Sequence, residues 1–170
     1  MFAVLHVLGL MLAFFAITFV MPMVCSLLAG DGMFADFAAA AGLNVLLGLA
    51  LALAFRRYRR ELKARDGFLL VTLVWVMMSA AASIPLLMAI PGLSFTDAYF
   101  EAMSGLTTTG STVLSGLDSL PPSVNLWRHA LHWYGGLGII VLAVAVLPLL
   151  GVGGMQVYKA ESPGPVKDEK

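Results

Sequence analysis

The chain has 170 residues and a formal net charge of zero, with 60% hydrophobic and 12% charged residues, and its mean hydropathy is +0.92. These values lie far outside the range of soluble domains and predict an integral membrane protein with too little mass left for an extramembrane enzyme. The single cysteine, Cys25, excludes an internal disulfide and a cluster of thiolates.

The first apolar run, residues 2–29, is long enough to cross about 30 Å of hydrocarbon with some tilt, and Pro22 is predicted to kink its far end. A cleaved signal peptide is the alternative interpretation. It is disfavoured because the start lacks Lys and Arg and because the run is longer than a signal-peptide core. We therefore expect a first membrane span here.

A second apolar run, 37–55, follows the turn GDGMFAD at 30–36 and ends abruptly at the basic sequence RRYRRELKARD. Two apolar runs joined by so short a turn predict a transmembrane hairpin over residues 1–56. The turn leaves no room for another helix between the two spans.

A third apolar run, 67–90, is again long enough to cross, and Pro91-Gly92 is a typical helix-terminating pair. The following segment, SFTDAYFEAMSGL, has the spacing of a capping box from Ser94 to Asp97 and about three turns of helix-compatible sequence. Asp97 is also favoured there by the helix dipole. We expect a half-helix that enters the membrane and stops.

The polar loop after the half-helix ends at Pro121-Pro122, and Ser123 is predicted to cap a fourth span over 124–150. The predicted fold class is therefore all-α integral membrane. A two-span N-terminal hairpin is followed by one span–pore helix–filter loop–span repeat over 67–150.

The basic residues predict the orientation in the membrane. Six of the ten lie within 56–65, and Lys159, Lys167 and Lys170 follow the last span. The loop at 57–66 and the tail at 151–170 are therefore expected on the cytoplasmic side. The RRYRR cluster is interpreted as an anchor to anionic membrane lipid, and no nucleic-acid partner is expected.

The sequence GLTTTGSTV, 105–113, places hydroxyl side chains around one glycine at membrane depth. An extended backbone from Thr107 to Thr112 would turn successive carbonyls toward one axis, where they replace the water around a monovalent cation. Gly110 would permit a dihedral that threonine resists, and the half-helix ending near Leu106 points its negative end toward the cavity. No acid lies between 102 and 117, which argues against a divalent-selective ring.

The same loop is also compatible with a purely structural role. Thr and Ser in membrane helices commonly bond back to the carbonyl four residues earlier, and a Gly/Thr stretch is also compatible with a packed re-entrant loop. Residue chemistry alone leaves both interpretations open.

The sequence SFTDAYFEAMSGLTTTGSTVLSGLDSLPPSVNLWRHALHWYGGLGIIVLAVAVLPLL, with GFLLVTLVWV before it, resembles the membrane subunits of the bacterial Trk/Ktr potassium-transporter superfamily, most closely the TrkH/TrkG branch. The resemblance covers nearly the whole chain and implies an extra N-terminal hairpin plus the first of four repeats around one potassium pathway. It implies K⁺ ligands at Thr108, Thr109, Gly110 and Ser111. We expect filter support from Thr107, Thr112 and Glu101, the last through hydrogen bonds behind the filter.

The resemblance also implies partners: the remaining three repeats, a dimer of full-length subunits and a cytoplasmic nucleotide-binding regulator of the TrkA type, all at a bacterial inner membrane. Potassium is the transported ion, and no covalent cofactor is expected. The sequence stops at Lys170 and has one TTTG, so an N-terminal portion of a longer transporter is expected. Four identical copies, or a non-conducting structural or regulatory membrane protein, are the alternatives.

Two groups on the predicted last span have structural interpretations. Small residues at Gly135, Gly136 and Gly138 are expected to let the half-helix and its loop approach the backbone. Both His129 and His132 are expected at an interfacial helix start with Trp127 and Trp133, rather than in a metal site, because no carboxylate or cysteine lies at a matching spacing.

Overall fold

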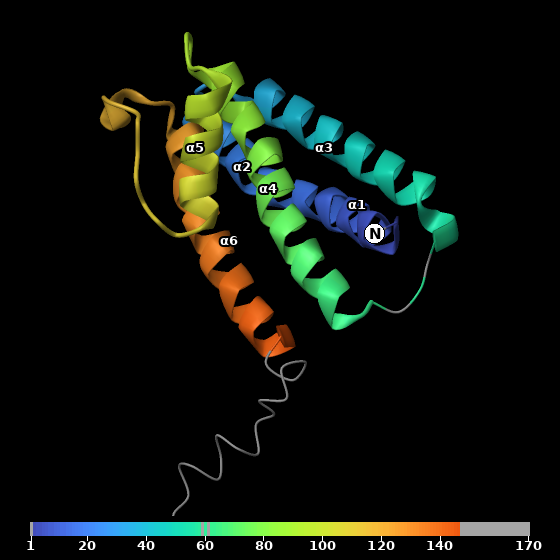
Figure 1. Cartoon of the computed structure of the whole chain (residues 1–170). Coiled ribbons are helices and arrows are strands. Elements are labelled where there is room, and N and C mark those ends of the chain that lie inside the picture. Colours follow the sequence, from blue (N-terminus) through green and yellow to red (C-terminus); the bar gives the residue numbers. More distant parts are fainter. Residues whose placement is uncertain (1, 59, 61, 147–170) are drawn as a thin grey trace, which may run out of the picture. The chain divides into compact units, whose positions relative to one another are not determined.

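The computed structural model describes residues 2–58, 60 and 62–146, and this part of the chain consists of helices and loops without a strand. Residues 1–136 form one compact unit, and a second begins at Leu137. Figure 1 labels the main helices, whose bounds are α1 Phe2–Phe15, α2 Val20–Ala29, α3 Phe34–Ala54, α4 Ala64–Ala89, α5 Phe95–Leu106 and α6 Pro122–Val146. Short 3₁₀ turns lie at Ala16–Phe19, Arg56–Tyr58 and Leu117–Ser119.

Three helical segments among the described residues are long and apolar enough to cross a membrane: Phe2–Ala29, Phe34–Ala54 and Arg65–Ala89. They coincide with the first three predicted spans, which confirms those predictions. The α6 helix begins at Pro122, two residues before the predicted start, and residues 147–150 of the predicted span lie outside the described part.

The first span is interrupted one turn before Pro22 and not at its far end. The chain tightens into the 3₁₀ turn Ala16–Phe19 and resumes as α2. Proline has no N–H to offer the carbonyl four residues earlier, and its ring crowds that carbonyl. The distortion therefore falls on the turn that precedes the proline.

The two arms of the N-terminal hairpin cross at a pair of glycines. A Cβ on Gly48 would lie 2.5 Å from the backbone nitrogen of Ala13, and a Cβ on Gly9 would lie 2.6 Å from the carbonyl oxygen of Gly48. On one side of this crossing the amide of Asn44 donates to the Leu12 carbonyl at 2.9 Å. Buried polar contacts and small residues are the usual means of joining helices in lipid, where apolar burial gives no preference for protein over membrane.

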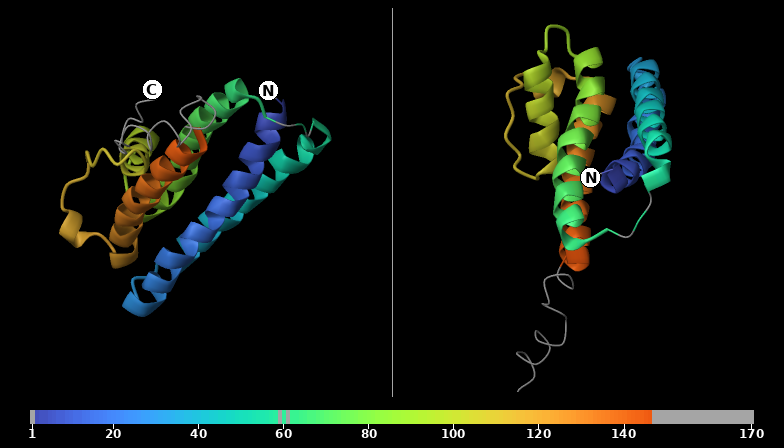
Figure 2. Two further views of the ribbon diagram at one scale, coloured as in Figure 1. Left: turned by 90° about the horizontal axis from the view of Figure 1, so that it is seen from below. Right: turned by 45° about the vertical axis from the view of Figure 1, so that its right-hand side comes forward.

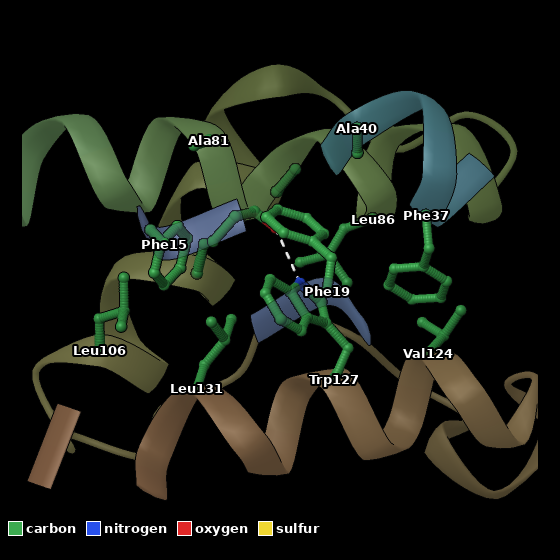
Figure 3. Packing of buried hydrophobic residues seen from close by; sticks show 13 residues of the cluster. Phe15, Phe19, Phe37, Ala40, Ala81, Leu86, Leu106, Val124, Trp127 and Leu131 are labelled. Carbon is green, nitrogen blue, oxygen red and sulfur yellow. Dashed lines mark hydrogen bonds between the residues drawn. The ribbon is translucent and has the colours of Figure 1, made fainter. Parts of the chain in front are cut away.

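The core of the first unit surrounds Trp127 of α6. Its indole is fully buried, stacks on Phe19 at a centroid distance of 4.6 Å and lies edge-on to Phe37. The indole N–H donates to the carbonyl of Ala82 in α4 at 3.0 Å, the dashed line in Figure 3. One side chain therefore joins the N-terminal hairpin, α4 and the start of α6.

The α5 helix is a re-entrant half-helix. It has 12 residues against 26 in α4, and in Figure 1 and the right view of Figure 2 the following loop turns back alongside it to the end at which α5 began. Ser94 caps its start as predicted, with the Ser94 hydroxyl accepting from the Asp97 N–H at 3.1 Å. The Tyr99 hydroxyl donates to the Val76 carbonyl in α4 at 3.3 Å.

A large side chain at Gly48 should separate the arms of the hairpin. We expect Gly48→Leu to lower the free energy of unfolding by about 1–3 kcal/mol, because the new atoms meet backbone that has no room to yield. The matched control is Gly42→Leu, in the same helix, where an added Cβ meets nothing within 4 Å. Thermal unfolding of both variants in detergent checks this, and equal stabilities would contradict it.

Candidate functional site

The loop begins by folding back over the end of α5. The backbone N–H groups of Thr107, Thr108 and Thr109 donate to the carbonyls of Met103, Gly105 and Ser104, at 2.8, 2.9 and 2.9 Å. These carbonyls belong to the last turn of the helix and have no partner within it. Wrapping back satisfies them, and it requires a left-handed backbone at Thr108, whose φ is +59°.

This turn corrects one prediction and agrees with another. The backbone was expected to be extended from Thr107, but Thr107 has φ −87° and ψ 1°, and Thr108 is left-handed. Satisfying the helix end prevails over extension at these two residues. Gly110 has φ +77°, the dihedral that threonine resists and that glycine was expected to supply.

Side-chain hydroxyls form hydrogen bonds between the loop and α5. The Thr107 hydroxyl donates to the Met103 carbonyl at 2.8 Å, which is the back-bonding expected of a packed loop, and it lies 2.8 Å from the Thr109 hydroxyl. The Ser104 hydroxyl donates to the Ser111 carbonyl at 2.7 Å. These contacts fix the loop to α5 from within.

The outer side of the loop is open. Residues 108–113 are exposed, and within the described residues no hydrogen bond reaches the backbone carbonyl oxygens of Thr108, Thr109 or Gly110. Of the four predicted ligand residues, only Ser111 has its carbonyl engaged. The loop therefore presents a short series of oxygens that the chain itself does not use.

Glu101 of α5 holds the second half of the loop. Its side chain is 3% exposed, and one carboxylate oxygen accepts from the Thr112 hydroxyl, from the Val113 N–H at 2.7 Å and from the Leu114 N–H at 3.3 Å. The Leu114 N–H also donates to the Thr112 hydroxyl at 3.1 Å, so the carboxylate and this hydroxyl together accept from the backbone donors of this part of the loop.

The other oxygen of Glu101 binds Arg128 of α6. The guanidinium Nε and Nη2 lie 3.2 and 3.1 Å from it, and Nη2 is also 3.3 Å from the Thr112 hydroxyl. The Arg128 side chain is 11% exposed. The half-helix α5, the loop and α6 therefore meet at one ion pair, and both of its charges are largely buried away from water.

The face of α6 that follows the loop contains both histidines. The Nδ1 atoms of His129 and His132 lie 2.7 and 2.9 Å from the Asn125 and Arg128 carbonyls, one turn earlier. With Gly110, Thr112, Leu117 and Asp118 these four α6 residues line an open cavity of about 410 Å³. Within the part of the chain that the structure describes, no three His, Cys, Asp or Glu residues are grouped for a metal ion.

The expected interfacial grouping of these histidines with two tryptophans is half wrong. Trp133 is 63% exposed, but Trp127 is fully buried in the core. The two lie on different faces because six residues along a helix rotate the side chain by about 240° beyond one full turn. The sequence pattern gave the helix but not which tryptophan faces inward.

Glycines bring α6 against the end of the half-helix, as predicted. A Cβ on Gly135 would lie 2.1 Å from the Leu106 carbonyl oxygen, which no side chain tolerates. Gly136 is in ordinary contact range of the Thr108 methyl group, at 3.9 Å. Gly138 lies beyond this unit. The close approach at Gly135 sets the position at which the loop leaves α5.

Asp31, in the turn GDGMFAD of the hairpin, holds the start of α6. Its carboxylate accepts from the Ser123 N–H at 2.9 Å, from the Ser26 hydroxyl at 2.5 Å and from the Met33 N–H at 3.1 Å. The predicted cap at Ser123 is therefore wrong. Pro122 takes the first helical position, which its fixed φ favours, and the capping acid comes from the hairpin turn.

The pKa of Asp31 reflects this environment. Burial raises it, but the hydrogen bonds from Ser26, Ser123 and Met33 outweigh burial and lower the pKa to about 2. A lowered pKa means that the stabilisation from the charged form is complete above the unfolded value of about 4 and is lost as the pH falls toward 2. Asp31 is thus ionised under all ordinary conditions.

Comparison with known proteins gives consistent results. Residues 34–170 match the TrkH family, described as a cation transport protein. The chain is 48% identical to the Trk system potassium uptake protein TrkH of Vibrio parahaemolyticus over 169 residues, and 38% identical to TrkG of Escherichia coli K12 over 168 residues. These alignments cover 99% and 98% of this chain but 35% of each relative.

A solved structure agrees with the sequence comparison. The crystal structure of the potassium transporter TrkH from V. parahaemolyticus superposes with a TM-score of 0.82 at 43% identity, over 94% of this chain and 35% of that one. The chain thus spans about a third of the length of the relatives it matches.

The Glu101–Arg128 pair should dominate the stability of this region. We expect Glu101→Gln and Arg128→Met each to lower the free energy of unfolding by about 3 kcal/mol, because each leaves the other charge buried without its partner. The joint replacement should cost less than the sum of the two. Asp118→Asn, an exposed acid in the same loop, is the control and should change little. Additive effects in chemical unfolding would contradict a coupled pair.

Proposed function

Because the chain belongs to the TrkH family of cation transport proteins, we propose that it forms the first part of the potassium-translocating subunit of a Trk-type uptake system. In this proposal the N-terminal hairpin, 1–56, and the basic loop, 57–66, precede the first pore repeat, 67–150, and a cytoplasmic tail follows at 151–170. The relatives are named as potassium uptake proteins, and this chain spans about a third of their length.

The observation that carries the proposal is the row of carbonyl oxygens in the exposed residues Thr108, Thr109 and Gly110, to which no described residue donates a hydrogen bond, just after a half-helix. A potassium ion that leaves water needs oxygens in place of its hydration shell, and backbone carbonyls held at a fixed spacing supply them without a net charge. Ser111 joins the set through its hydroxyl, since its carbonyl is engaged by Ser104. We assign these four residues as potassium ligands of the first repeat.

The residues behind the loop act as support. Glu101 and Thr112 hold the loop from the side of α5 and α6, and Thr107 fixes its first turn. None of the three needs to touch the ion. Their task is to keep the ligand oxygens in place while the ion loses its hydration water. Selectivity between ions of the same charge is decided at this step.

One loop covers only one side of an ion. The proposal therefore includes three further repeats, contributed by the rest of the subunit, that close the ring around the exposed loop face. A dimer of full-length subunits and a nucleotide-binding regulator of the TrkA type on the cytoplasmic side complete the proposed assembly in the bacterial inner membrane, with lipid around it.

Gly110 provides the direct test of the ligand assignment. The assay uses a chimaera in which residues 1–170 replace the matching third of V. parahaemolyticus TrkH. A side chain at φ +77° costs about 1 kcal/mol or more of local strain. We therefore expect Gly110→Ser to insert normally while the preference for potassium over sodium falls and uptake weakens.

The matched control is Gly116→Ser in the same loop, where φ is +67° but the residue lies outside the ligand set. The backbone strain at the two positions is of the same kind, and an added Cβ on Gly116 also lies 3.3 Å from the Ser119 hydroxyl oxygen, so the control substitution is sterically at least as demanding as Gly110→Ser. Potassium uptake and ion preference are measured in cells that lack other potassium uptake systems. If both variants kept the original ion preference, the assignment of Gly110 would be wrong.

The proposed orientation is tested by cysteine labelling of the chain in bacterial membranes. With Cys25 replaced by Ala, we expect Arg57→Cys to be shielded from an impermeant reagent added outside and Asp118→Cys to react, because the basic residues favour the cytoplasmic side. Both positions are exposed in this chain. The reverse labelling pattern would overturn the orientation.

A further inference from the structure

The turn between α2 and α3 carries a carboxylate that is fixed on both of its oxygens. One oxygen of Asp31 accepts from Ser26 and Met33, which belong to the hairpin itself. The other accepts from the N–H of Ser123, 92 residues later in the chain. The hairpin turn is thus tied to the first turn of α6 through an ionised group.

The contact places a negative charge at the positive end of α6. The first N–H groups of a helix have no partner within it, and a carboxylate that accepts from one of them stabilises the helix start. Ser26 and Met33 hold the Asp31 side chain in the rotamer that reaches Ser123. The position of the helix start is therefore set by the hairpin and not by a cap within the repeat.

The part of α6 that follows Ser123 is the part that touches the loop. Arg128 lies five residues further, about 7.5 Å along the helix axis, and binds both Glu101 and Thr112. His132 follows one turn later, with its Nε2 3.9 Å from the Cβ position of Gly110. A packed helix moves as a unit, so a shift at its start is passed to Arg128 and His132.

We propose that Asp31 is a positioning residue for ion selection, through which the N-terminal hairpin sets the place of α6 and hence of the loop 107–113. This inference rests on the proposed function. It assigns a role in selectivity to a segment that lies outside the pore repeat and contributes no ligand to the ion. Asp31 acts through Ser123, Arg128 and Glu101.

The test uses the same chimaera with Asp31→Asn and Asp31→Ala. We expect the preference for potassium over sodium to fall about three- to tenfold, as suits the loss of a charged helix cap, with Asp31→Ala the stronger of the two. The matched control is Asp36→Asn, an acid of the same turn region for whose side chain no hydrogen bond is found among the described residues. It should leave the preference unchanged.

Ser26→Ala is a second variant, milder for folding. It removes one bond that orients the Asp31 carboxylate and leaves the acid in place, so a smaller loss of preference is expected. The amount of protein in the membrane is measured for every variant, because a role in folding alone lowers that amount without changing the ratio of the two ions transported.

Gly110→Ser separates the two proposals. If it alters ion preference while Asp31→Asn, Asp31→Ala and Ser26→Ala behave like Asp36→Asn, the positioning role is overturned and the ligand assignment stands. If none of the variants, Gly110→Ser included, changes the preference, both fail. The positioning role is supported if Asp31→Ala lowers the preference for potassium most, Asp31→Asn less, and Ser26→Ala least.

Discussion

The buried charge of Glu101 is the constraint on which the loop region depends. A carboxylate that is almost fully removed from water is tolerated only when its oxygens are paired and hydrogen-bonded. Here Arg128 takes one oxygen, while Thr112, Val113 and Leu114 take the other. Satisfying one charge therefore fixes a half-helix, an irregular loop and a long helix at once. The left-handed backbone of Thr108 has another source, the carbonyls at the end of α5 that accept from the N–H groups of this turn, and strained backbone of this kind survives only where surrounding contacts determine it.

The packing around this pair follows from the solvent that the protein faces. Lipid is as apolar as a protein core, so helices in it are held by close approach and by polar contacts. Gly48 and Gly135 provide close approach, each with backbone where a Cβ would be. The indole N–H of Trp127 and the amide of Asn44 each donate to a carbonyl of a neighbouring helix. The hairpin and the repeat are joined by the same means, at the Trp127 core and at Asp31.

Local patterns in the sequence predicted the helices well. Apolar run length gave the first three spans, the Ser94 to Asp97 spacing gave the start of the half-helix, and Gly110 was placed correctly in a left-handed conformation. These features depend on neighbours in the chain.

What failed depends on partners far away in the chain. Nothing local distinguishes Trp127 from Trp133, or shows that Asp31 replaces Ser123 as the cap of α6, since that contact spans 92 residues. The left-handed Thr108 was missed because propensity opposes it, and only the unpaired carbonyls of the helix end favour it.

The same contacts bear on how an ion would be selected under the proposed function. The carbonyls of Met103, Ser104 and Gly105 in the last turn of α5 already accept from the N–H groups that follow the helix, so these three have little left to offer an ion directly. The charge of Glu101 is balanced by Arg128, so this pair, among the described residues, adds no net negative charge behind the loop. The exposed residues 108–111 contribute neutral carbonyls and hydroxyls. Such a set binds a cation through the number and spacing of its dipoles, which favours a weakly hydrated monovalent ion over a divalent one that would require carboxylates. Selectivity then rests on keeping those oxygens at a fixed spacing, which is the task of the buried groups behind them.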